Sequence, residues 1–171
     1  MNLSHPIFRY AIVLATYALL QYAVASQFRI DRVSVDLLLV LAISAGMQSG
    51  VEVGAVIGFG CGLAMDLLTV TPFGLGAISL LAAGVVGAGL ERATVHSARW
   101  LTMVVAFISA TASLVLFAVL GSMMGRNDLV NGHLLIVVLV VSSTSAILVF
   151  PTLRACRWAD PEESRIRTAA R

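Results

Sequence analysis

Two aspartates inside long apolar stretches are the residues of this sequence best placed to do chemistry. Asp36 and Asp66 each lie about one helical turn from the expected outer end of an apolar run. A carboxylate within a membrane-spanning segment is costly, and it therefore usually marks a partner or a function. Arg32 lies four residues before Asp36 and can reach it along a helix. The three side chains are either solvated or paired at the interface, or they form one polar cluster that caps helix ends or holds a partner's segment.

Motifs for enzymatic or metal chemistry are missing from the sequence. It has no phosphate-binding loop, no HExxH, no paired Cys/His ligand set and no nucleophile elbow. Cys61 and Cys156 are isolated thiols. His5, His96 and His133 are far apart and lie near the ends of apolar runs. We therefore expect no catalytic residue, cofactor or metal site in the sequence.

The composition places these residues in lipid. Of the 171 residues, 59% are hydrophobic and only 12% are charged, whereas a soluble domain carries about 25% charged residues. This chain has too few polar groups to cover a water-exposed surface, which excludes an ordinary cytosolic enzyme, a nucleic-acid binder and a disordered tail protein. The formal net charge is only +2, so the bulk charge implies no acidic partner.

Six apolar runs are candidate spanning helices, since about 20 apolar residues cross the roughly 30 Å of hydrocarbon. Only Ser49 and Gly50 separate the second run from the third, so these two could instead form a re-entrant pair that does not fully span. We predict an all-α polytopic membrane protein, a compact bundle of about six transmembrane helices in a single domain over residues 1–171, with 151–171 as a short cytoplasmic tail. The runs are Tyr10–Phe28, Val33–Gln48, Val51–Val70, Phe73–Leu90, Trp100–Gly121 and Leu129–Phe150.

The arginines predict the orientation of these runs. With the N-terminus inside, the inner segments carry eight arginines and the outer loops carry three. Since positive residues favour the cytoplasmic side, both termini are expected in the cytoplasm. Tyr10, Trp100 and Trp158 lie near the ends of runs and are expected to anchor the chain at the membrane interface. The basic and acidic residues of the tail are expected to form a short solvated end near anionic headgroups.

Small residues predict where the helices pack. Gly54, Gly58 and Gly62 recur every four residues and form a groove along one side of the third run. Close backbone approach supplies much of the packing between helices in lipid. We expect this groove to hold another helix of the same chain, with Gly84 and Gly87 as a partner face, although an intermolecular interface is the alternative.

A tight outer turn is expected between the third and fourth runs, over residues 69–74. Pro72 fixes its own φ and tends to start the next helix, and Gly74 relaxes the steric limits on the backbone.

Three segments of the sequence resemble a known family. They are Asp-Leu-Leu-Leu at 36–39, Gly-Phe-Gly-Cys-Gly-Leu-Ala-Met-Asp-Leu-Leu at 58–68 and Pro-Phe-Gly-Leu-Gly-Ala at 72–77. This pattern resembles the MreD family of rod-shape-determining membrane proteins, which has an Asp-Leu-Leu early in the second span, a Gly-Phe-x-x-Gly-Leu-x-x-Asp-Leu-Leu stretch and a Pro-x-Gly-Leu turn. Val35 departs from the family pattern, which usually has Pro before the Asp.

The resemblance implies a scaffold in the bacterial inner membrane that is not an enzyme. Members of the family bind MreC, a bitopic protein with a periplasmic domain. Together they support peptidoglycan synthesis and cell shape with RodA, its penicillin-binding transpeptidase and MreB filaments.

The family fold is also similar to the substrate-binding subunits of energy-coupling-factor vitamin transporters, which gives the alternative function. An aromatic content of only 7% and the scarcity of ionisable groups within the runs argue against a ligand cavity.

Overall fold

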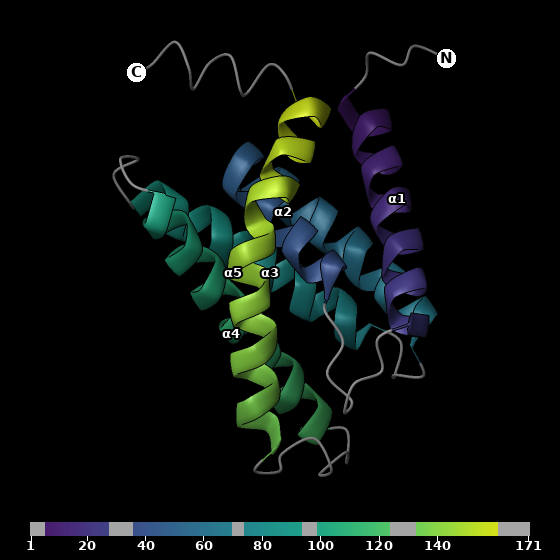
Figure 1. Ribbon diagram of the computed structural model, residues 1–171, viewed down its shortest axis with the longest axis vertical. Helices are drawn as coiled ribbons and strands as arrows, with labels where there is room; N and C mark the ends of the chain where they lie inside the picture. The colour runs from purple at the N-terminus through teal and green to yellow at the C-terminus, as the bar shows by residue number, and fades with distance from the viewer. Residues whose placement is uncertain (1–5, 28–35, 70–73, 94–98, 124–132, 161–171) are drawn as a thin grey trace.

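Five α-helices form the described part of the protein. A computed structural model describes residues 6–27, 36–69, 74–93, 99–123 and 133–160 (Figure 1). Four stretches of helix are long and apolar enough to cross a membrane: Leu37–Leu68, Leu75–Ala93, Arg99–Met123 and Ile136–Ala159. These features support a helical multi-pass membrane protein. The helices are α1 (Pro6–Gln27), α2 (Leu37–Leu68), α3 (Leu75–Ala93), α4 (Arg99–Met123) and α5 (His133–Ala159).

The second and third apolar runs form one element, α2, which is sharply bent at Gly50. Gly50 has φ 89° and ψ −176°, a backbone conformation that is essentially restricted to glycine. A Cβ added at Gly54 would lie 2.6 Å from the Cα of Gly46, whereas eight residues of straight helix cover about 12 Å. The two parts of α2, a first arm (residues 37–49) and a second arm (residues 51–68), therefore fold back on each other.

The two arms of α2 correspond to the second and third expected runs. The first arm is about 20 Å long at 1.5 Å per residue, which is short of the roughly 30 Å of a bilayer core. The described residues hold five helices, one of which consists of two arms joined at Gly50. Six separate spanning helices and a re-entrant pair in place of the second and third both stay predictions. Polar helix ends at a bend are tolerated at membrane depth where they are buried in protein.

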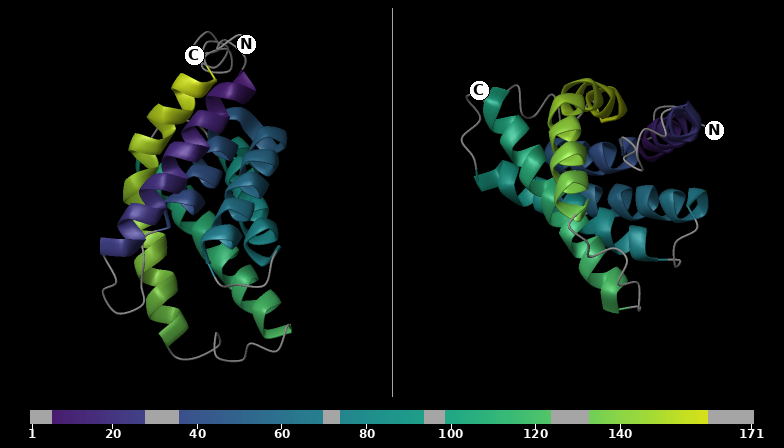
Figure 2. Two further views of the ribbon diagram at one scale, coloured as in Figure 1. Left: turned by 90° about the vertical axis from the view of Figure 1, so that its right-hand side faces the viewer. Right: turned by 60° about the horizontal axis from the view of Figure 1, so that its bottom comes forward.

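The first arm of α2 is the centre of the core. Every residue from Leu38 to Gly50 is buried. Both arms belong to the helix that contacts α1, α3, α4 and α5, so the other helices are arranged around it. Figure 2 shows the start of α1 and the end of α5 side by side at one end of the bundle.

Two local expectations from the sequence differ from the structure. Tyr10 is buried instead of anchoring at the interface, and its hydroxyl lies 2.6 Å from Ser49 Oγ, next to the bend. α5 continues to Ala159 through an exposed Pro151, so residues 151–159, which the sequence assigned to a tail, are helical. The extension is held because Thr152 and Cys156 are buried on the inner side of α5. Residues 161–171 lie outside the described ranges.

We predict that Gly50→Ala destabilises the protein by about 1–3 kcal/mol, because an L side chain is strained at this φ and ψ. The measurement is the free energy of unfolding in detergent. Gly89→Ala is the control, since a Cβ at Gly89 meets nothing within 4 Å and alanine favours a helix interior. Equal stability of the two variants would contradict the bend as a glycine-dependent feature.

Candidate functional site

A seam of direct backbone contact joins the second arm of α2 to α3. A Cβ added at Gly58 would overlap the carbonyl oxygen of Leu80, and one added at Gly62 would overlap the Cα of Ala77. A Cβ at Gly54 would lie 3.0 Å from the carbonyl oxygen of Gly84. The structure therefore places the groove of the third run against a helix of the same chain, where any larger residue would force the two backbones apart.

Gly84 lies where three helical segments meet. A Cβ added there would overlap the carbonyl oxygen of Gly54 on the second arm and lie 3.3 Å from the carbonyl oxygen of Ala42 on the first arm. A Cβ at Gly46, on the first arm, would overlap the carbonyl oxygen of Gly84. A Cβ at Gly87, on α3, would lie 3.3 Å from Cγ2 of Ile43 on the first arm. The faces of α3 and of both arms are thus complementary at backbone distance.

Gly46 is a packing residue that our sequence analysis missed. It lies four residues before Gly50 and eight before Gly54, so it extends the same spacing backward along the chain. This spacing was the available signal, but it does not reveal that the backbone reverses at Gly50.

Asp66 caps the start of α3. Its Oδ2 accepts hydrogen bonds from the backbone N–H of Gly74 at 2.8 Å and of Ala77 at 3.3 Å, and its Oδ1 accepts one from Gly76 at 3.0 Å. The side chain is only 4% exposed. The first N–H groups of a helix have no partner within that helix, and they carry a positive partial charge that a carboxylate complements. Asp66 therefore fastens the end of α2 to the beginning of α3.

The start of α3 leaves room for this carboxylate because Gly76 lacks a side chain. A Cβ at Gly76 would overlap Asp66 Oδ1, so close approach requires glycine there. Gly74 has φ 99°, in the left-handed region that favours glycine. Pro72 lies outside the described residues, and its role in the turn stays a prediction.

Asp36 caps a different helix. Its Oδ1 accepts a hydrogen bond at 3.0 Å from the backbone N–H of Leu39 and so caps the first arm of α2. The neighbouring N–H of Leu37 donates at 2.8 Å to Oε1 of Gln21, from α1. Gln21 was not anticipated as a functional residue, although a buried amide within an apolar run was a signal for one. The start of α2 thus depends on two side chains from two helices.

The two aspartates have the same structural role at the starts of two different helices. Each is buried and accepts hydrogen bonds from the backbone at the start of a helix, Asp36 for α2 and Asp66 for α3. Of the alternatives left by the sequence, this agrees with helix capping. Arg32 lies outside the described residues, so its pairing with Asp36 stays a prediction. The arrangement uses carboxylate oxygens to fix backbone positions, which is a structural use of these groups.

Buried hydroxyls link the remaining helices. Ser44 Oγ on the first arm donates to Thr152 Oγ1 on α5 at 3.0 Å. Ser113 Oγ on α4 donates to the carbonyl oxygen of Ser79 on α3 at 2.8 Å. Interhelical hydrogen bonds of this kind hold helices together in lipid, so these contacts fix α4 and α5 around the seam.

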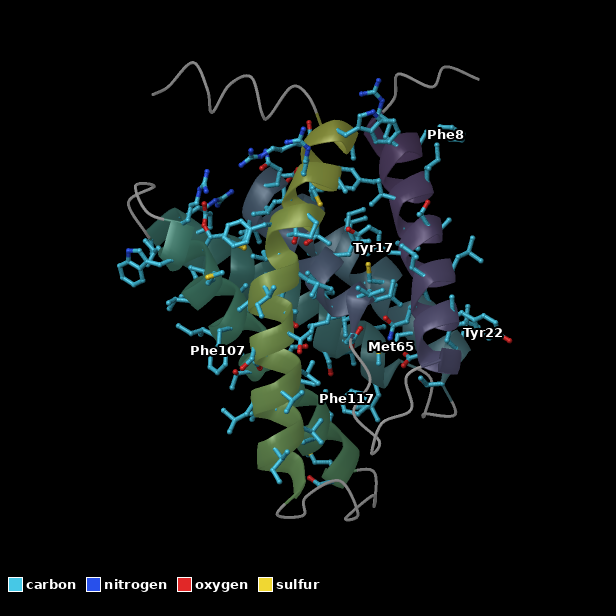
Figure 3. All side chains as sticks on the ribbon, viewed as in Figure 1. Phe8, Tyr17, Tyr22, Met65, Phe107 and Phe117 are labelled. Atoms are coloured by element: carbon cyan, nitrogen blue, oxygen red, sulfur yellow. The ribbon has the colours of Figure 1, made fainter. Side chains whose placement is uncertain are left out.

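An apolar groove lies between α4 and α5 and opens outward. Phe107, labelled in Figure 3, belongs to its lining. Its one polar lining side chain is Ser143, so the groove offers a ligand little specific hydrogen bonding. The lining residues are Met103, Val104, Phe107, Ser143 and Ala146.

Comparison of the chain with protein-family models, with curated proteins and with solved structures gave no match.

We predict that Asp66→Asn lowers the free energy of unfolding by about 2 kcal/mol, because an amide keeps one acceptor oxygen where the carboxylate uses two. Asp36→Asn is the matched comparison, since its described bond uses one oxygen and asparagine caps helices about as well as aspartate. We expect a loss below about 0.5 kcal/mol there. Chemical unfolding of both variants in detergent gives the two values. Equal losses would refute the distinct role of Asp66.

We predict that Gly62→Ala lowers the free energy of unfolding by about 2 kcal/mol, because its Cβ would press on the backbone of α3. Gly60→Ala, two residues away on the same arm, is the control. A Cβ there would meet only Leu14 Cδ1, the end of a flexible side chain, at 3.2 Å. The thermal midpoints of both variants in detergent test the seam, and a Gly62→Ala midpoint as high as that of Gly60→Ala would count against it.

Proposed function

We propose that the chain is a non-enzymatic scaffold subunit of the MreD type in the bacterial inner membrane. In this role it binds MreC and supports the cell-elongation machinery, which includes RodA, its penicillin-binding transpeptidase and MreB. One observation carries the proposal: three residues on which the resemblance rests, Gly58, Gly62 and Asp66, help to build the seam and its cap. Gly58 and Gly62 touch α3, and Asp66 holds the turn that contains Gly74.

This coincidence supports a shared fold and not merely a shared composition. A chance match in an apolar sequence would scatter its glycines and acids over unrelated positions. Here Gly58 and Gly62 face the same helix, and Asp66 caps its start with three backbone hydrogen bonds. Since a fold alone does not dictate function, the partner MreC enters by analogy with the family.

The packing of the bundle weighs against the alternative of a vitamin-binding transporter subunit. Such a subunit needs a concave chamber with several convergent polar groups. In the described residues the centre is filled by the buried first arm of α2. The groove between α4 and α5 is open and mostly apolar. A scaffold that presents helix faces to other membrane helices agrees better with this packing.

The proposed orientation has both termini in the cytoplasm. The start of α1 and the end of α5 meet at one end of the bundle, where Arg9 Nη1 donates to the carbonyl oxygen of Trp158 at 3.2 Å. This contact supports placing both ends of the chain on one side of the membrane. The excess of arginine in the inner segments supports assigning that side to the cytoplasm.

We predict that the protein co-purifies with MreC when the two are co-expressed and extracted in mild detergent. Asp66→Asn should lower the yield of the complex, because its loosened seam presents a less defined surface. Leu67→Ala is the control, since the adjacent Leu67 side chain is 75% exposed and makes no cap. Mass spectrometry of the purified protein gives a second readout. No MreC in the preparation, or a stoichiometric small vitamin in its place, would overturn the proposal.

A further inference from the structure

We propose that the end of the bundle where α1 begins and α5 ends binds the headgroup of an anionic phospholipid. Arg154 and Arg157 would contact the phosphate, with Arg9 and Trp158 beside them. The inference depends on insertion into a membrane and does not depend on MreC as a partner.

The length of the uncharged part of α5 sets the depth of these arginines. Residues 134–153 contain no charged side chain, and 20 helical residues cover about 30 Å, the thickness of the hydrocarbon core. Arg154 is the first charge after this stretch, and Arg157 follows one turn later. On α1, Arg9 directly precedes an uncharged stretch over residues 10–28. The three guanidinium groups therefore lie at headgroup depth.

Arg9 and Trp158 form the structured part of the site. The guanidinium of Arg9 lies 5.4 Å from the centroid of the Trp158 ring and donates to the carbonyl oxygen of the same residue. A cation over an indole face is attracted by the ring electrons. This pair joins α1 to α5 and fixes a positive charge and an interfacial aromatic ring side by side.

Arg154 and Arg157 supply the donors for a ligand. Both are exposed, and no hydrogen bond or ion pair within the described residues involves either side chain. The guanidinium group binds phosphate with two parallel hydrogen bonds, and a charged donor strengthens them. Asp160, the next acid on the chain, is buried. Two arginines in this position are opposite in charge to a phosphate and offer the paired N–H donors that it accepts from.

An apolar face continues below the arginines, and it favours a lipid over a free phosphate or an acidic protein. One face of α5 carries, in order, Ile147 (65% exposed), Pro151, Arg154 and Trp158. Successive members of this set are four, three and four residues apart, which is the spacing of one helix face. A phospholipid has both required parts: an anionic headgroup for the arginines and an acyl chain for this face.

The test compares phosphatidylglycerol with phosphatidylcholine on the delipidated full-length protein in detergent, with native mass spectrometry to count bound lipid. We expect tighter binding of phosphatidylglycerol by the wild-type chain. Each arginine near a charged membrane surface contributes about fivefold in affinity, so Arg154→Gln with Arg157→Gln should weaken binding by about 25-fold. The double lysine variant, which keeps both charges, should retain most of the binding.

The matched control is Arg99→Gln, at the exposed start of α4, and its affinity should stay at the wild-type value. Equal binding of the two lipids, or an equal loss in Arg99→Gln, would overturn the site. Displacement of the lipid by millimolar inorganic phosphate would assign the arginines to a soluble anion. A glutamine variant that keeps phosphatidylglycerol but loses a co-purifying acidic protein would assign them to a protein partner. Either result would also refute the proposal.

Discussion

The three hydrogen bonds between Asp66 and the start of α3 hold the part of the protein on which the other helices are built. The first N–H groups of a helix cost several kcal/mol each if they are kept from water without a partner. A buried carboxylate from the preceding helix removes this cost and at the same time fixes the turn. The second arm of α2 and α3 are thereby brought together in one register.

That register determines the rest of the packing. With the turn fixed, Gly62, Gly58 and Gly54 meet α3 in order along the seam, and Gly84 on α3 is left facing the first arm of α2. The first arm then lies in the middle of the bundle, where its backbone carbonyls and hydroxyls must be satisfied by the protein. Tyr10 on α1 and Thr152 on α5 reach it from opposite ends of the chain.

The sequence predicted those features that depend on local composition. Apolar length predicted membrane helices, and the spacing of Gly54, Gly58 and Gly62 predicted a close contact. The break at Ser49 and Gly50 between the second and third runs indicated where the backbone reverses, but the sequence did not predict the positive φ of Gly50, because a glycine permits this conformation without requiring it. Nor did it predict Gln21 as a cap of α2 or the continuation of α5 past Pro151, since both depend on side chains far away in the sequence.

The hydrogen bond between Ser44 and Thr152 joins residues 108 positions apart, and this separation matters during synthesis. The ribosome delivers the first arm of α2 to the membrane long before α5 exists. The nascent bundle must therefore keep its centre open on the side of α5 until the last helix arrives. The seam between the second arm and α3 can close early, whereas the hydroxyl contact closes last. Completion of the interior is thus tied to the synthesis of α5.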